Sequence, residues 1–229
     1  MTDPFFIGID GPAGAGKSSV SKESARRLGY GYLDTGSVYR ALAWHVLDAG
    51  ASTDDPGAVL AAFDSFRPRI SLDPDVRTVR VGETDVTDAI RTPETSAAVS
   101  GVARVLPVRE RVNALFRSLV ARSGLPGVVV EGRDITTVVA PDAPVRILLT
   151  AHPDVRAARR SAELGDADTA GVAAAMRKRD ASDSEVVDFL HAAPGVDVVD
   201  TTDLDFDQSV AAVLSVIDEK THRGGHDGH

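Results

Sequence analysis

The sequence contains no cysteine, few aromatic residues and no long apolar run. Without cysteine there is no disulfide framework, no thiolate metal site and no cysteine nucleophile. No stretch approaches the ~18 apolar residues of a membrane span, and the N-terminal MTDPFFIGIDG lacks the basic segment of a signal peptide. We therefore expect a cytoplasmic protein whose core is filled mainly by aliphatic side chains.

Positive charge is also in short supply. Lys and Arg number 25 against 34 Asp and Glu, which gives a formal net charge of −9 at pH 7. Such a chain is a poor partner for a nucleic-acid polymer or an anionic membrane, whereas small phosphate compounds remain possible ligands. No heptad pattern extends over several turns and no long apolar patch suggests an interface, so we expect a monomer.

Short apolar runs alternate with longer stretches of helical period along the 229 residues. The short runs predict strands at 5–9, 31–33, 128–130, 145–149 and 196–199. The longer stretches predict helices at 17–28, 37–48, 94–105, 108–122, 153–164, 168–180 and 206–220. This alternation is typical of an α/β fold with a parallel sheet covered on both faces.

Two segments depart from this rhythm. From about Arg67 to Asp88, apolar and polar residues alternate and turn residues are frequent, which predicts a small antiparallel insert. The tail THRGGHDGH has three His and three Gly without an apolar period, so we expect it to be disordered. Metal binding by those histidines is the alternative interpretation of the tail.

A glycine-rich segment, GPAGAGKS at residues 11–18, matches the pattern G-x-x-x-x-G-K-[ST] and lies between the first strand and the first helix. Its backbone N–H groups and the positive end of the helix can bind phosphate oxygens, with Lys17 reaching the β- and γ-phosphates and Ser18 available to Mg²⁺. We expect the phosphates of a nucleoside triphosphate to be bound by Gly11, Pro12, Ala13, Gly14, Ala15, Gly16, Lys17, Ser18 and Ser19.

This motif does not identify the reaction, because GTPases, motors and kinases share it. A GTPase would need an Asn-Lys-x-Asp base reader, and the only asparagine is Asn113, in RVNALF. A kinase for a phosphorylated acceptor must bring two anions together. At an effective dielectric of ~20 each like-charge pair ~4 Å apart costs roughly 4 kcal/mol, so further cations should lie on loops at the strand ends.

Such cations are present. Arg40 follows the second strand in LDTGSVYR, and Arg133 follows the third strand in VVVEGRD, beside Glu131 and Asp134. A guanidinium group suits this role because it binds phosphate through two parallel hydrogen bonds. Glu131 or Asp134 could hold Mg²⁺ through water, accept hydrogen bonds from a base or ribose, or form an ion pair with Arg133. The other candidates are Arg109, Arg177 and Arg179.

These segments resemble the bacterial cytidylate kinases, which belong to the P-loop nucleoside monophosphate kinases. The likeness runs from IDGPAGAGKSSVS through YLDTGSVYRALA and VVVEGRDITTVVAPDAPVRILLTA to RKRDASDS. It implies a three-layer αβα P-loop fold with a five-stranded parallel sheet. It also implies a kinase core at 1–64 and 91–222, an acceptor-binding insert at 65–90, a helical lid at about 155–175 and a disordered tail at 223–229.

The resemblance further implies ATP and Mg²⁺ as cofactors and CMP and dCMP as acceptors. Carried over by position, Arg40 and Arg133 look like ligands of the acceptor phosphate. The residues that look like readers of the cytosine are Thr35, Ser100, Arg109 and Asp134, with Arg179 and Asp183 near the sugar. The groups that would neutralise the transferring phosphoryl group are Lys17, Arg133 and lid arginines such as Arg156, Arg159 or Arg160.

The chain departs from the family pattern at three positions. Val186 stands where relatives usually have an arginine, a loss that could lower the rate roughly 10- to 1000-fold unless Arg177 or Lys178 replaces it. Thr136 replaces a usual glycine and Ala140 a usual aromatic residue, and a glycine needed for positive φ would not convert to threonine without strain. Two alternatives therefore stay open: a kinase for UMP or another small phosphate, and a nucleotide-binding sensor without turnover.

Overall fold

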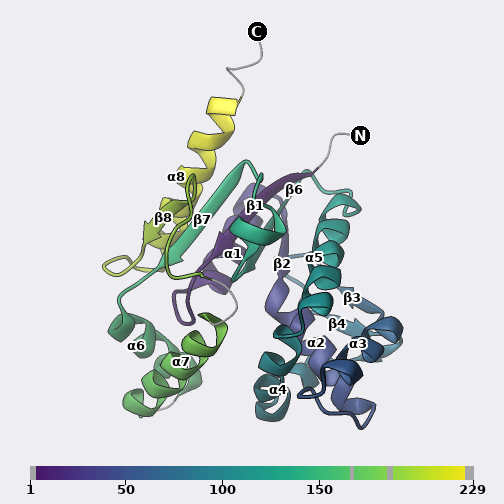
Figure 1. Cartoon of the computed structure of the whole chain (residues 1–229). Coiled ribbons are helices and arrows are strands. Elements are labelled where there is room, and N and C mark those ends of the chain that lie inside the picture. Colours follow the sequence, from purple (N-terminus) through teal and green to yellow (C-terminus); the bar gives the residue numbers. More distant parts are fainter. Residues whose placement is uncertain (1–3, 166–167, 185–187, 225–229) are drawn as a thin grey trace. The chain divides into compact units, whose positions relative to one another are not determined.

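The computed structural model describes residues 4–165, 168–184 and 188–224 of the chain (Figure 1). The side chains of Arg179, Ser182, Asp183 and residues 222–224 are not among those described. The chain divides into two compact units. The first contains residues 1–32 and 124–229, and the second contains residues 33–123.

A five-stranded sheet is the centre of the fold, with strand order β2-β6-β1-β7-β8. Its strands are β1 (Phe5–Asp10), β2 (Gly31–Asp34), β6 (Gly127–Gly132), β7 (Val145–Thr150) and β8 (Asp197–Asp200). The central strand β1 pairs in parallel with both neighbours, so that Ile7 lies opposite Val129 of β6 and Val145 of β7. The predicted strands and the predicted parallel sheet are confirmed.

The core of the first unit lies on one face of this sheet, under α1 (Lys17–Leu28) and α8 (Phe206–Gly224). Alternate strand residues form it with apolar residues of these helices: Ile7, Ile9, Val129, Val145, Ile147, Leu149, Val20, Ala25, Val210, Val213 and Ile217. On the opposite face, η2 (Ile135–Val139) packs against β1 so closely that a Cβ at Gly8 would lie 3.1 Å from Ile135 Cγ2. Burial on both faces explains why these strands read as continuous apolar runs.

Helix ends in the first unit follow local signals. α1 ends where Gly29, at φ 67, donates its backbone N–H to the carbonyls of Ala25 and Arg26. α6 (Pro153–Leu164) begins with a proline in its first turn and ends at Gly165, at φ 65. α7 (Thr169–Ser184) packs beside α6, as Figure 1 also shows.

The second unit is built around α2 (Thr35–Asp48), which carries the only tryptophan of the chain, Trp44, half-buried. α3 (Pro56–Ser65), η1 (Ala89–Arg91) and α4 (Pro93–Ala103) all contact α2, and α5 (Leu106–Ala121) contacts α3 and α4. The predicted antiparallel insert is confirmed as a sheet of β3 (Pro68–Ile70), β4 (Val79–Val81) and β5 (Thr84–Asp85). This segment, predicted to span residues 65–90, lies wholly within the second unit.

The seven predicted helices are present, with ends shifted by up to four residues. Helix α3 was not predicted from the sequence. Its N-cap, Asp55, accepts hydrogen bonds from the N–H groups of Gly57 and Ala58, and Pro56 occupies the first turn. α8 continues through Gly224, so the first four residues of THRGGHDGH, which was predicted to be disordered, are helical. Residues 225–229 lie outside the described part. Among the described helices, none has the length and apolarity required to span a bilayer.

Candidate functional site

The loop between β1 and α1 leaves no room for side chains at two of its glycines. A Cβ built on Gly11, which has φ +150, would lie 2.0 Å from the backbone oxygen of Leu149. A Cβ on Gly14, at φ +73, would lie 2.7 Å from the backbone oxygen of Arg156 and 2.7 Å from Met176 Cε. The backbone of this loop is therefore fixed against β7, α6 and α7 by close packing that only glycine permits.

The N-terminus of α1 fits an anionic ligand. Its N-cap, Gly16, is in the left-handed region at φ 86, and no side chain in the described part of the chain forms a capping hydrogen bond there. The first N–H groups of a helix have no intrahelical acceptor, so they and the helix dipole can bind a phosphate oxygen. Lys17 Nζ donates to the carbonyl of Pro12 at 2.9 Å, and the exposed Ser18 follows it in the first turn.

Two arginines lie against the same loop. Arg133, in the segment after β6, donates from Nη1 to the Gly11 carbonyl at 2.9 Å, and Arg156 of α6 donates from Nη1 to the Ala13 carbonyl at 2.9 Å. The guanidinium carbon of Arg133 lies 4.2 Å above the ring of the buried Phe189. Both guanidinium groups pair with Asp180 of α7. Arg133 therefore lies at the glycine-rich loop of residues 11–16, between β1 and α1, which is called the phosphate loop below.

Asp10, at the end of β1, binds the segment that follows Arg133. Its carboxylate accepts hydrogen bonds from the N–H groups of Ile135 and Thr136 at 2.9 and 2.8 Å, and from Thr136 Oγ1 at 2.6 Å. No non-glycine residue among those described has positive φ, so the strain considered for Thr136 is absent. Thr136 instead supplies a donor that a glycine lacks.

This contact makes the contribution of Thr136 to the free energy of unfolding dependent on pH. Burial raises the pKa of the Asp10 carboxyl above its ordinary value, although the hydrogen bonds from Thr136 and Ile135 oppose the shift. The stability contributed by a group with a raised folded-state pKa is complete below its unfolded-state pKa and declines as pH rises through the folded-state pKa. Thr136→Val removes a donor to the ionised form, which raises the folded-state pKa of Asp10 further.

We expect Thr136→Val to lower the free energy of unfolding by about 1–3 kcal/mol near neutral pH and by less near pH ~4. Urea unfolding at both pH values measures the difference. Thr221→Val is the matched control, because the Thr221 hydroxyl donates to the backbone carbonyl of Ile217 and not to a carboxylate. A loss of stability for Thr136→Val that is equal at both pH values would contradict this reasoning.

In the second unit, the segment that begins α2 brings Asp34 and Arg40 together. The Asp34 carboxylate caps the helix by accepting from the N–H of Ser37 at 3.0 Å, and Arg40 Nη2 donates to its other oxygen at 2.8 Å. Both side chains are largely covered, at 23% and 17% exposure. The capping bond and the ion pair together hold the Arg40 guanidinium in one orientation. Thr35 follows Asp34 in the sequence, is the first residue of α2 and is buried.

The other predicted site residues are distributed over several elements. Ser100 lies half-buried on α4, Arg109 of α5 donates to the Ala103 carbonyl at 3.3 Å, and Asp134 is buried at the start of η2. Arg159 donates to Thr201 Oγ1 and to the carbonyls of Thr201 and Leu204, and Arg160 pairs with Glu163 at the surface. Arg179 and Asp183 lie on α7 without described side chains, and Val186 lies outside the described residues.

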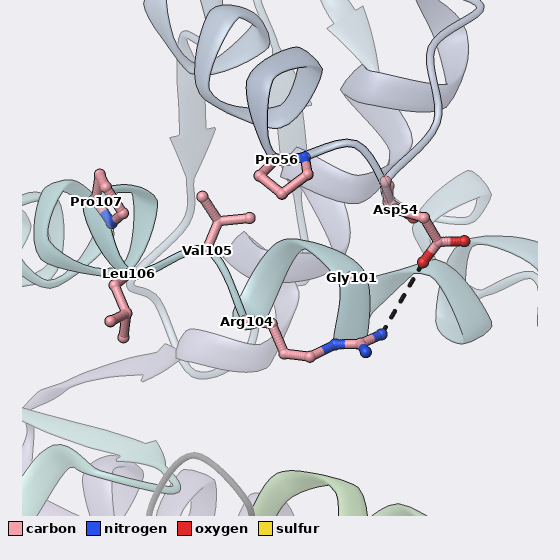
Figure 2. A pocket seen from close by; sticks show the side chains of 8 residues that line it. Asp54, Pro56, Gly101, Arg104, Val105, Leu106 and Pro107 are labelled. Carbon is pink, nitrogen blue, oxygen red and sulfur yellow. Dashed lines mark ion pairs between the residues drawn. The ribbon is translucent and has the colours of Figure 1, made fainter.

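The second unit also contains a pocket of about 440 Å³ between the segment before α3 and the α4–α5 corner (Figure 2). Its lining residues are Thr53, Asp54, Pro56, Gly101, Arg104, Val105, Leu106 and Pro107. The Arg104 and Asp54 side chains approach to 4.0 Å, as the dashed line in Figure 2 marks, and both are mostly exposed. An exposed ion pair of this kind contributes little to the free energy of unfolding. None of the predicted site residues that the structure describes lines the pocket.

Three carboxylates at these sites were not singled out from the sequence. Asp10 stands directly before the glycine-rich segment, Asp34 within LDTGSVYR, and Asp180 within RKRDAS. Asp10 and Asp34 lie beside or inside motifs of known chemistry, which is the signal that could have identified them, whereas RKRDAS shows only a charged helix. Among the described residues, no group of three or more His, Cys, Asp or Glu could hold a metal ion.

The sheet topology and the glycine-rich loop between β1 and α1, with the arginines against it, define a P-loop class of α/β protein. A family model described as Cytidylate kinase matches residues 7–219. A "Cytidylate kinase" of Cutibacterium acnes is 48% identical over 219 residues, covering 94% of this chain and 97% of that protein. One of Streptomyces avermitilis is 46% identical over 218 residues, covering 94% and 93%.

The chain belongs to the cytidylate kinase family, which confirms the resemblance seen in its motifs. Membership makes the protein a phosphotransferase and implies the use of ATP. Among solved structures, an uncharacterized protein from Eubacterium ventriosum aligns with TM-score 0.53 and 13% identity, covering 93% of this chain and 98% of that one. That likeness concerns the fold only.

Proposed function

We propose that the protein transfers the γ-phosphate of ATP to CMP and dCMP, forming CDP and dCDP. The observation that carries this proposal is the pair of guanidinium groups, Arg133 and Arg156, that contact the phosphate loop in addition to Lys17. A kinase that joins two anions needs several cations at one place, because each unscreened like-charge pair opposes binding. The family and its cytidylate kinase relatives support the choice of acceptor.

In this proposal the glycine loop binds the ATP phosphates through its backbone N–H groups and the N-terminus of α1, and Lys17 leaves the Pro12 carbonyl to reach them. The proposed nucleotide-binding residues are Gly11, Pro12, Ala13, Gly14, Ala15, Gly16, Lys17, Ser18 and Ser19. The Ser18 hydroxyl would hold Mg²⁺, which when bound neutralises charge on the β- and γ-phosphate oxygens.

The acceptor phosphate is bound by Arg40 and Arg133, whose forked donors match phosphate oxygens. The cytosine is read by Thr35, Ser100, Arg109 and Asp134, and the sugar lies near Arg179 and Asp183. A carboxylate such as Asp134 accepts a hydrogen bond from the exocyclic amine of cytosine, which the carbonyl of uracil cannot supply. This contact disfavours UMP as an acceptor.

Phosphoryl transfer in this site requires positioning and charge neutralisation without a covalent intermediate. We assign the neutralising role to Lys17, Arg133 and the lid arginines Arg156, Arg159 and Arg160. Arg159 and Arg160 lie on α6, which together with α7 would act as the lid that excludes water from the reacting groups. We further propose that the protein acts as a monomer in the cytoplasm.

A coupled assay of ADP release tests this proposal. ATP and Mg²⁺ are offered with CMP, dCMP, UMP, AMP or no acceptor, and Lys17→Ala serves as the blank. We expect turnover with CMP and dCMP well above that with UMP or AMP. Equal rates with UMP would favour the broader pyrimidine acceptor, and binding of both nucleotides without ADP release would favour the sensor.

A further inference from the structure

Three donors converge on the carboxylate of Asp180, on α7. The N–H of Ala13 donates to Oδ1 at 3.2 Å, Arg133 Nη2 donates to Oδ1 at 3.3 Å, and Arg156 Nη1 donates to Oδ2 at 2.7 Å. Asp180 is 7% exposed, so these contacts are largely shielded from water. Charge-assisted hydrogen bonds in such surroundings are stronger and more directional than surface pairs.

The same two arginines also donate to carbonyls of the phosphate loop, Arg133 to Gly11 and Arg156 to Ala13. Arg133 makes its two contacts through Nη1 and Nη2, and Arg156 makes both through Nη1, so each guanidinium is held by Asp180 and by the loop backbone. One helical turn before Asp180, Met176 of α7 lies against the loop at Gly14. The face of α7 that carries Met176 and Asp180 thus covers the loop, and Asp180 supplies the polar part of that contact.

Among the described contacts of this cluster, two guanidinium groups share the Asp180 carboxylate. A carboxylate at the Ala13 N–H has two opposite effects on a bound phosphate. It repels the phosphate charge, and it keeps both guanidinium groups at the loop in the absence of nucleotide. Removing its charge without changing its shape should separate these two effects.

We infer that Asp180 is a positioning residue of the phosphotransfer site, whose carboxylate orients Arg133 and Arg156 against the phosphate loop and ties α7 to that loop. This inference rests on the proposed function for one of its two readouts, turnover. The other readout, binding of ADP in the absence of divalent metal, requires only that the loop bind phosphates.

Asp180→Asn tests the charge. We expect kcat to fall about tenfold or more, because the arginines lose the group that orients them. We expect ADP, titrated calorimetrically without metal, to bind at least about threefold more tightly, because one negative charge is gone from the site. A residue that only holds the fold together would give weaker ADP binding together with lower turnover, and that result would overturn the inference, as would unchanged kcat or unchanged ADP affinity.

Asp180→Glu tests whether the position of the carboxylate is important, and it is the deciding variant for the positioning role if Asp180→Asn does not fold. The charge is kept while the carboxylate is displaced by one methylene, so we expect kcat about tenfold lower with ADP affinity within about twofold of wild type. Wild-type kcat in Asp180→Glu would overturn the positioning role. Asp197→Asn is the matched control, since Asp197 of β8 also pairs with a cation, Lys220, at 2.9 Å. That variant should retain both values.

Failure of the proposed function would appear differently. Wild-type protein without turnover on CMP and dCMP would contradict the function, while the comparison of ADP affinities between wild type and Asp180→Asn would still decide whether the Asp180 charge acts on phosphate binding.

Discussion

Arg133→Ala is expected to lower kcat/KM for CMP by about 10²- to 10³-fold, the range found when a preorganised donor is removed from a site where charge develops. Arg133 contacts the Gly11 carbonyl, Asp180 and the ring of Phe189 at the same time, so its guanidinium has one orientation at the phosphate loop. Arg133→Lys should recover little of the activity, because an ammonium group lacks the rigid fork that presents two parallel donors and the planar surface that stacks on Phe189.

Arg111 offers a matched control for this prediction. Its guanidinium also lies over a phenylalanine, Phe63, at 5.5 Å, and also pairs with an aspartate, Asp64, at 2.6 Å. The Arg111 pair is exposed, whereas the Arg133 side chain is 19% exposed. Arg111→Ala should therefore change kcat/KM by less than about twofold. Equal losses in Arg111→Ala and Arg133→Ala, with both proteins folded, would contradict a specific role of Arg133 in the reaction.

Gly11→Ala is expected to lower the free energy of unfolding by roughly 3–5 kcal/mol, or to prevent folding. Two penalties add at this position. An alanine there would be strained at φ +150, and its Cβ would lie 2.0 Å from the Leu149 backbone oxygen, which belongs to the buried strand β7 and cannot move aside cheaply. Chemical denaturation followed by far-ultraviolet circular dichroism measures the change.

Gly29→Ala separates the two penalties. Gly29 also has positive φ, +67, but no atom of the described residues lies within 4 Å of a Cβ built on it. This variant should cost only the backbone strain, about 1–2 kcal/mol. If Gly11→Ala and Gly29→Ala lost the same stability, the contact with β7 would have no energetic weight and the close packing of the phosphate loop would need another explanation.

The sheet and most helices could be predicted from the sequence because their signals are local. The run VVV of β6 is apolar throughout, and α1 is bounded by Gly16 and Gly29. Helix α3 escaped prediction because it is short and lies in a segment where only the Asp55 cap and Pro56 indicate its start. The short helix η2 was also not predicted, since the run ITTVV has low helix propensity. Its conformation depends on hydrogen bonds to the Asp10 carboxylate, which lies far away in the sequence.

The residues of the candidate site also divide into those with a local sequence signal and those without one. Lys17, Arg40 and Arg133 could be proposed as site residues because each follows a strand or lies within a motif of known chemistry. The role of Asp180 could not, because RKRDAS shows only a charged helix. Whether Asp180 faces the loop or the solvent depends on how α7 is rotated against α6 and the loop, and that rotation is set by packing at Met176 and Gly14. Long-range packing of this kind has no signature in a single sequence.

The placement of Trp44 on α2 gives the protein an internal optical probe. Trp44 lies one helical turn after Arg40, is half-buried, and is the only tryptophan in the chain. Its emission therefore originates from the second unit alone, with no contribution from the sheet or from α6 and α7. Events at the helix that carries Arg40 can be followed by intrinsic fluorescence in the unmodified protein. Because the chain has no cysteine, a single cysteine introduced at a chosen position would be the only site for a thiol-reactive label.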